Sequence, residues 1–369
     1  MIFVTILVFI VIFSTLVLVH EWGHFYMARR AGIKVEEFGI GLPPRAKAIF
    51  TDKKGTVYSL NWIPFGGYVR LHGEDSSDPE VLKDKESFAS KTKLQRTAVI
   101  VAGVFMNFVL AWLLLTIGFS IGMKPILTSK ADLNAAVASG MAEVHAQLYV
   151  SEIEEGSPLI EAGLMPKDVI VKINGQDVPK ATEISSVIKP NETVSLDFIR
   201  GEEEKTINVV ATAEGKLGFK IADAPEISQK TVRYPVYEAA WVSVTEVGRL
   251  SYLTVKMLGN VVVSLVAKFT VPEGVAGPVG IFKMTEQFTA EGAVPLLQFA
   301  ALLSISLGVI NIMPFPALDG GRFLFILIEI VLRKRPSAKW EGLIHGVGFI
   351  LLMALILVIT WNDIWKLIA

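Results

Sequence analysis

Residues 2–24 read IFVTILVFIVIFSTLVLVHEWGH, an apolar run that ends in an H-E-x-x-H motif. A run of this length and composition is typical of a transmembrane helix. On a helix, His20 and His24 lie one turn apart on one face, where both imidazoles can bind one zinc ion. Glu21 can then take a proton from the attacking water. Because ionisable groups within a span are costly and usually functional, the stretch predicts a zinc protease that works inside a bilayer.

The composition is that of a membrane protein with a water-exposed part. The chain has 369 residues, of which 52% are hydrophobic and 19% charged, and its mean hydropathy is +0.51. These values predict membrane spans plus at least one soluble domain. The net charge of −1 gives no reason to expect a nucleic-acid partner. Since the chain has no cysteine, zinc would need histidine and carboxylate ligands.

Four apolar segments, at about 2–27, 97–122, 296–331 and 343–361, are long enough to cross a hydrocarbon core of ~30 Å. The third is interrupted by Pro314 and Pro316, a break that is tolerated where a helix lines a protein-enclosed or wet cavity. The first could also be a signal peptide. It lacks a basic start and a small-residue cleavage site, so we expect a retained span.

Basic residues orient these spans. They follow the first span at Arg29, Arg30, Lys34, Arg45, Lys47, Lys53 and Lys54, and the third at Arg333, Lys334, Arg335 and Lys339. By the positive-inside rule both loops are cytoplasmic, which places both termini and residues 123–295 outside. Counted inward at 1.5 Å per residue, His20 lies ~27 Å below Ile2 and Asp319 ~35 Å below Leu296. Both fall toward the cytoplasmic side and could share one metal.

A zinc site needs a third protein ligand. Asp319 follows the helix breakers of segment 311–321, NIMPFPALDGG, and a cation would offset the cost of its charge. Two alternatives remain open. His345, at the inner start of the last span, is a rival ligand, and Asp319 could instead form a salt bridge with Arg322.

Asn311 is a polar group at span depth beside Pro314, whose missing N–H frees a backbone carbonyl. Its amide could hydrogen-bond the substrate backbone or a developing oxyanion. It could equally join two helices.

Three further regions differ from the spans. Residues 35–75 mix strand formers with turn residues and predict β-hairpins near the membrane surface, where an edge could add a strand to a substrate; an ordinary cytoplasmic loop is the alternative. Residues 145–222 predict a small α/β domain with a turn at Asn174-Gly175. Residues 236–268 are amphipathic and could lie in the membrane interface or pack on the spans.

These motifs together resemble the site-2 proteases, specifically the bacterial RseP-like intramembrane metalloproteases. The resemblance covers nearly the whole chain and rests on HEWGH (20–24), FGIG (38–41), PFGGYVR (64–70), GPVGI (277–281) and NIMPFPALDG (311–320). It implies that His20, His24 and Asp319 hold Zn²⁺ and that Glu21 is the general base and later proton donor. Asn311, with Pro314, would help to position the scissile backbone.

Residues 157–177 resemble a bacterial PDZ domain, which is circularly permuted in this family. Gly215-Lys216-Leu217-Gly218-Phe219 would then be the carboxylate-binding loop, so Gly215, Leu217 and Gly218 are candidate substrate-binding residues. The best-studied relative has two such domains in tandem, whereas this chain has room for one. A single domain would gate substrates by size, bind a partner's terminus, or do neither.

The resemblance implies a polytopic α-helical protein of the bacterial inner membrane with four transmembrane helices, a membrane-associated β-hairpin region and one inserted α/β PDZ-like domain. Its substrate would be a single-span protein already cut outside by an upstream site-1-type protease, such as an anti-sigma factor or a remnant signal peptide. The alternatives are a membrane PDZ adaptor and a zinc transporter without protease activity. The expected segments are 1–30, 96–123, 295–332 and 340–365 for the transmembrane helices, 31–95 for the β region, 145–222 for the PDZ-like domain and 223–294 for the amphipathic region.

Overall fold

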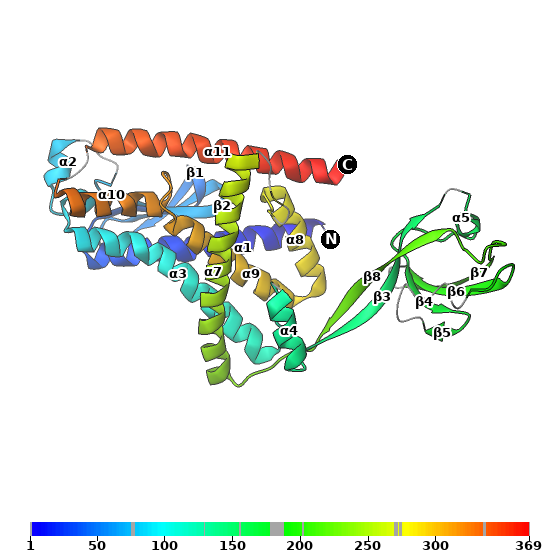
Figure 1. Ribbon diagram of the computed structural model, residues 1–369. Coiled ribbons are helices and arrows are strands. Elements are labelled where there is room, and N and C mark those ends of the chain that lie inside the picture. Colours follow the sequence, from blue (N-terminus) through cyan, green and yellow to red (C-terminus); the bar gives the residue numbers. More distant parts are fainter. Residues whose placement is uncertain are drawn as a thin grey trace. The chain divides into compact units, whose positions relative to one another are not determined.

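The computed structural model describes residues 2–74, 78–128, 130–154, 156–177, 188–200, 203–268, 272, 275–334 and 337–368. It divides into two compact units, one formed by residues 1–123 together with 233–369 and the other by residues 124–232 (Figure 1). The first unit carries the predicted spans and the second contains the predicted soluble domain.

Within the described residues, four helices of the first unit are long and apolar enough to cross a membrane. They are α1 (Ile2–Arg30), α3 (Lys93–Ile121), α9 (Ala293–Ile312) and α11 (Ala338–Ile368). Helix α3 packs against α1 and α9. Gly23 of α1 lies against Ala102 and Gly103 of α3 so closely that a Cβ would overlap backbone atoms. Small residues at this crossing therefore bring the two helices together.

The third predicted span is two helices. Helix α9 ends at Ile312, and α10 (Asp319–Leu332) begins after a turn over residues 313–318. Pro314 and Pro316 lie in this turn, where neither has to donate a helical hydrogen bond. The break leaves Asp319 as the first residue of α10.

The predicted β region consists of two long antiparallel strands, β1 (Val35–Thr51) and β2 (Val57–Leu71). Both strands bend, so that residues 35–40 pair with 57–60 on one side and with 67–71 on the other. Residues 57–61 also pair with 45–51. The segment 67–71 therefore forms the edge beside α1, which β2 contacts. After β2 come the short helix α2 (Pro79–Lys83) and the 3-10 turn η1 (Phe88–Ser90).

Glu37 fixes the centre of this sheet. Its side chain is only 2% exposed and binds Arg45 through two hydrogen bonds of 2.8 and 2.5 Å, and Ser59 through one of 2.7 Å. Burial by itself raises the pKa of the Glu37 carboxyl, but hydrogen bonds from Arg45, Ser59 and Tyr68 outweigh it and lower the pKa to about 2. The buried carboxylate thus holds the bend that brings Arg45 back onto the sheet.

Two described helices of the first unit precede α9 in its second chain segment. Helix α7 (Val236–Lys268) coincides with the predicted amphipathic stretch and runs across the direction of α1 and α11 (Figure 1). One face packs on α3 and α9, where Trp112 Nε1 donates to Ala240 O at 2.9 Å, while Tyr237, Trp241 and Tyr252 are exposed. Helix α8 (Pro278–Glu291) packs on α1, α9 and α11.

The start of α8 is capped by another helix. Its N-cap residue, Gly277, has no side chain to do so. Instead, Oδ2 of the buried Asp363, near the end of α11, accepts hydrogen bonds from the backbone N–H groups of Gly277 at 2.9 Å and Gly280 at 2.8 Å. The carboxylate thereby satisfies amides that the first turn of a helix leaves unpaired.

The second unit is a single antiparallel sheet with short helices. Its strands run in the order β7-β6-β4-β3-β8, with β5 beside β4. Leu148, Leu159, Ile173, Leu196 and Phe198 form the centre of its core. In chain order the elements are α4 (Lys130–Ala138), β3 (Ala142–Ile153), α5 (Pro158–Glu161), β4 (Val169–Ile173), β5 (Gln176–Asp177), β6 (Thr193–Arg200), β7 (Glu203–Val210) and β8 (Phe219–Gln229).

Candidate active site

Three side chains from two distant segments meet at the C-terminal half of α1. The Nε2 atoms of His20 and His24 are 3.0 Å apart, and Oδ2 of Asp319 lies 3.0 Å from the first and 3.2 Å from the second. Among the described residues, they are the one group of at least three His, Asp or Glu side chains that could share a metal ion.

The donor set fits zinc. Ligand atoms on a tetrahedral ion with bonds of ~2.0–2.2 Å lie roughly 3.3 Å from one another, close to the observed triangle. Asp319 Oδ2 is buried and has no hydrogen bond of good geometry, although two imidazole nitrogens lie beside it. A cation at the centre of the triangle would satisfy all three atoms at once.

The Nδ1 atom of each imidazole, which points away from the candidate metal position, also has a hydrogen-bond partner. His24 Nδ1 lies 2.9 Å from Val99 O, so this nitrogen carries the proton and leaves the Nε2 lone pair toward the site. His20 Nδ1 lies 3.1 Å from the amide of Asn107, which is 0% exposed. Asn107 Oδ1 is buried without a hydrogen-bond partner, whereas the reversed amide orientation would let it accept from His20 Nδ1–H. Such partners fix the orientation of metal-binding imidazoles.

Sequence reasoning missed two residues of α3 that support the histidines. Gly103 lies under the His24 ring, where a Cβ would overlap the ring atoms. Asn107 is one turn further along and reaches His20. The available signal was a glycine and a polar residue four positions apart in an apolar span, where a buried amide needs a partner.

Glu21 lies between the β sheet and the candidate metal-binding group of His20, His24 and Asp319. Its Oε2 accepts a hydrogen bond of 3.0 Å from the backbone N–H of Val69, in the edge segment of β2. Glu21 also lines a pocket of about 210 Å³, whose other lining residues are Val17, His20, Leu307, Asn311, Ala317, Leu318 and Asp319.

The turn that carries Asp319 is tightly packed. Ala317 has φ of +78°, a left-handed conformation that non-glycine residues rarely adopt. Gly320 and Gly321 lie against the backbone carbonyls of Met313 and Phe315, leaving no room for a Cβ at either position. The glycines thus allow α10 to start directly beside the end of α9.

The two alternatives to Asp319 as the third ligand were a salt bridge from Asp319 to Arg322 and ligation by His345, and both of these residues have other partners. Arg322 forms an ion pair with Glu74, from the loop after β2, while Asp319 lies against the two imidazoles. The Nδ1 of His345 accepts a hydrogen bond of 2.9 Å from the backbone N–H of Ala317, and His345 is not part of the metal-binding group.

Asn311 lies in the last turn of α9 and lines the same pocket as Glu21 and Asp319. Pro314 is exposed in the turn. The carbonyl that Pro314 leaves without its helical donor, that of Ile310, accepts a hydrogen bond of 3.1 Å from Met313 N–H. The carbonyl that Pro314 frees from its helical donor thus finds another donor, because the turn tightens.

Comparison with known proteins identifies the family. Residues 8–355 match the model of peptidase family M50. The chain belongs to peptidase family M50. The zinc metalloprotease RasP of Shouchella clausii is 31% identical over 98% of this chain and 99% of its own length. The regulator of sigma-W protease RasP of Bacillus subtilis is 30% identical over the same shares. As an M50 metallopeptidase with such relatives, the chain is expected to use Zn²⁺.

The second unit of this M50 protein carries the candidate carboxylate-binding loop. Gly215 and Gly218 have φ of +73° and +71°, and the buried Leu217 accepts a hydrogen bond of 2.7 Å from Ser157 Oγ through its carbonyl. The loop leads into β8, which has β3 as its one neighbour in the described sheet. A solved PDZ domain of an SdrC-like protein from Listeria monocytogenes is similar at 19% identity, covering 20% of this chain and 86% of that chain, with a TM-score of 0.19.

Proposed function

We propose that this M50 protein is an intramembrane zinc metalloendopeptidase that cuts transmembrane segments. The observation that carries the proposal is that His20, Glu21 and His24 lie on a helix long enough to span a bilayer, and that Asp319 meets the two histidines there. A general metalloprotease tethered to the membrane would instead carry its motif in a soluble part.

His20, His24 and Asp319 would hold the ion. When bound, zinc supplies a Lewis acid that polarises the scissile carbonyl and makes water more acidic. Glu21 takes the proton from the attacking water and later gives it to the leaving amine. The Asn311 amide, in the same pocket, hydrogen-bonds the substrate backbone and keeps the scissile bond beside Glu21.

The edge of the β sheet could bind the substrate in an extended conformation beside the site. A peptide bond in a helix is shielded by its own hydrogen bonds, so the substrate has to be extended before attack. Segment 67–71 lies beside the site, and its Val69 N–H already reaches Glu21. A substrate strand added along this segment would place its backbone next to the base.

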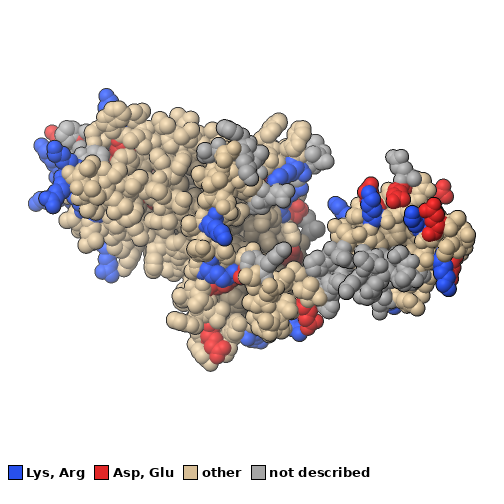
Figure 2. Space-filling model, in the orientation of Figure 1, with Lys and Arg blue, Asp and Glu red and all other residues tan. Residues whose placement is uncertain are grey.

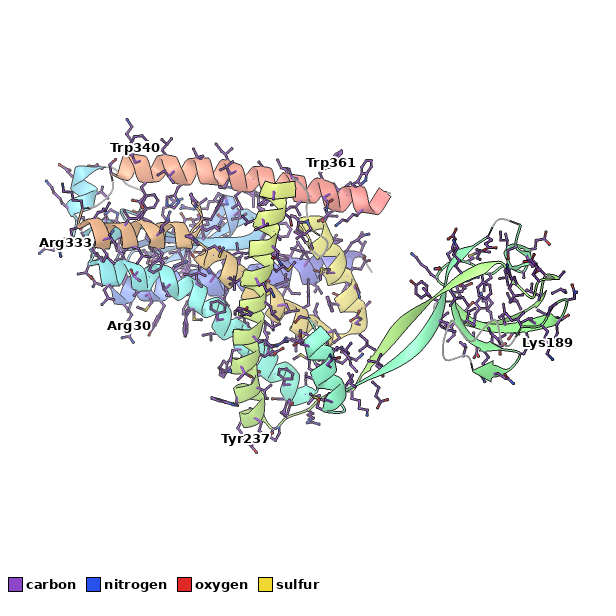
Figure 3. All side chains as sticks on the ribbon, viewed as in Figure 1. Arg30, Lys189, Tyr237, Arg333, Trp340 and Trp361 are labelled. Atoms are coloured by element: carbon purple, nitrogen blue, oxygen red, sulfur yellow. The ribbon has the colours of Figure 1, made fainter. Side chains whose placement is uncertain are left out.

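The proposed orientation puts the site toward the cytoplasm. Arg30 and Arg333, at the C-terminal ends of α1 and α10, lie at one end of the first unit (Figure 3), and Figure 2 shows Lys and Arg gathered there. The N and C termini lie at the opposite end of this unit (Figure 1). By the positive-inside rule, the basic end is cytoplasmic and both termini lie outside the bacterial inner membrane. The connections to residues 124–232 leave from the outer side.

For the substrate we propose a single-span protein that an upstream protease has already shortened, such as an anti-sigma factor or a remnant signal peptide. The relative from Bacillus subtilis is called a regulator of sigma-W protease, which favours the first. The PDZ-like domain at 145–222, through Gly215, Leu217 and Gly218, would bind the new terminus or exclude uncut proteins.

The test is cleavage of a model transmembrane peptide in detergent by the full chain. A zinc chelator should stop cleavage and added Zn²⁺ should restore it, and Glu21→Gln enzyme should be inactive in parallel. Chelator-insensitive cleavage, or equal cleavage by Glu21→Gln, would contradict the proposal. Absence of cleavage of any membrane substrate by zinc-loaded protein would favour a PDZ adaptor or a zinc transporter.

A further inference from the structure

The last transmembrane helix contacts the turn that carries Asp319 at two positions of one face. His345 Nδ1 accepts a hydrogen bond of 2.9 Å from Ala317 N–H. Three residues later, Gly348 lies so close to Pro316 that a Cβ there would come within 2.7 Å of the Pro316 carbonyl oxygen. Positions i and i+3 share a helix face, so α11 meets residues 316 and 317 along one line.

The hydrogen bond falls on the most constrained residue of the turn. Ala317 has φ of +78°, a conformation in which the Cβ of an L-residue crowds its own backbone. Such a conformation persists only where surrounding contacts hold it. An acceptor for the Ala317 N–H is one such contact, and the Pro316 side of the turn is closed by Gly348.

The backbone at Ala317 decides where Asp319 points. Leu318 and Asp319 follow directly, and Asp319 Oδ2 must stay within 3.0–3.2 Å of two imidazole nitrogens. If Ala317 turned to an ordinary negative φ, the first turn of α10 would leave its place against Met313 and Phe315. The His345 ring is itself packed against Phe325 of α10, with ring centroids 5.5 Å apart.

We propose that His345 is a positioning residue for the metal site: by accepting the Ala317 N–H from α11, it holds the left-handed turn that aims Asp319 at His20 and His24. The inference rests on the proposed role of Asp319 as a ligand. It gives the fourth span a part in zinc retention although α11 supplies no ligand.

The test compares three substitutions of full-length protein in detergent. His345→Asn keeps an acceptor oxygen where Nδ1 lies, His345→Gln moves the oxygen one bond further, and His345→Phe keeps the ring against Phe325 but has no acceptor. Zinc affinity is measured by competition with a chromophoric chelator, and kcat and KM on a transmembrane peptide. We expect His345→Asn to stay near wild type, and His345→Phe and His345→Gln to bind zinc on the order of 10-fold more weakly, as for lost outer partners of ligands.

A second set separates positioning from general support. In the background of Ala317→Gly, where glycine adopts the left-handed turn without strain, His345→Phe should weaken zinc binding much less than it does alone. Gly348→Ala, which pushes α11 away from Pro316, should lower zinc affinity with His345 intact.

The outcomes distinguish this inference from the proposed function. If Asp319→Ala loses zinc but His345→Phe binds it as tightly as wild type, the positioning role is wrong and the ligand assignment stands. Equal losses for His345→Asn and His345→Phe, or the same loss with and without Ala317→Gly, would also overturn it. If Asp319→Ala keeps its zinc, the ligand assignment itself fails.

Discussion

The two segments that meet at the candidate metal site are built in opposite ways. His20 and His24 sit one turn apart on a continuous helix, and the regular backbone of α1 sets their spacing. Asp319 starts a second helix after a turn that contains two prolines and a left-handed alanine. One half of the site therefore follows from local geometry, whereas the other depends on contacts with α9, α10 and α11.

Because of this difference, the two halves of the site should respond differently to substitutions. Substitutions near the histidines should act through their immediate partners, Val99, Gly103 and Asn107, all on α3. Substitutions near Asp319 should act through backbone conformation, because carbonyls and glycines fill the space around the turn.

The largest effect is expected for Glu21→Gln. The amide cannot take a proton, so cleavage should fall by at least ~100-fold, within the range typical of a lost general base. Bound zinc should remain near the wild-type amount, because both imidazoles and Asp319 are unchanged. Turnover of a transmembrane peptide and metal content by mass spectrometry would be measured on the same preparation. Normal turnover would remove Glu21 as the base.

Asp319→Ala tests the half that depends on tertiary contacts. Two imidazoles alone do not complete a zinc site, so the purified protein should contain markedly less zinc than wild type. Circular dichroism would check that the helices are intact. Zinc content equal to that of wild type would assign the third ligand position to another group.

Asn107 tests the local half at its outer partner. Asn107→Leu removes the side-chain amide that contacts His20 Nδ1 and should weaken zinc binding by ~10–100-fold, whereas Asn107→Asp places an acceptor oxygen there and should retain most of the affinity. Affinity would be read from competition with a chelator. Equal losses in the two variants would mean that Asn107 contributes packing and not orientation.

Glu37 lies outside both halves, and its largest expected effect is on the stability of the folded protein. Its pKa in the folded protein is about 2, below the ordinary value of 4.5. The carboxylate therefore stabilises the folded state fully above about pH 4.5, and this contribution is lost as the pH falls toward about 2. Glu37→Gln should lower the melting temperature by on the order of a few °C at neutral pH and remove part of its acid dependence. Melting curves in detergent between neutral and acid pH would show this, and a parallel acid dependence in both proteins would contradict it.

Features that depend on neighbouring residues in the chain could be predicted from the sequence. The H-E-x-x-H spacing, the apolar spans and the helix breakers before Asp319 are all readable from the order of residues, and the family expectation is confirmed. The ligand and base roles of His20, Glu21, His24 and Asp319 stay predictions that the geometry supports.

The remaining parts depend on distant pairings. Asn107 lies 87 positions from His20, and Ala317 N–H bonds to a side chain 28 positions away. No local pattern encodes either contact. The bent sheet was also beyond reach, since residues 35–40 pair on both sides with segments of the same later strand. A β-hairpin could be predicted, but the pairing of residues 35–40 with two segments of β2 could not.

The cap that Asp363 places on α8 joins the last described helix of the first unit to a helix much earlier in the chain. Gly277 and Asp363 are 86 positions apart. One carboxylate oxygen of Asp363 accepts hydrogen bonds from the N–H groups of Gly277 and Gly280, at the start of a helix whose N-cap residue makes no side-chain hydrogen bond. Trimming the chain before Asp363 would thus unravel the start of α8, a helix that touches α1. An affinity tag added after Ala369 would leave that carboxylate in place. The stability of α8 is therefore expected to depend on a side chain 86 positions later in the chain.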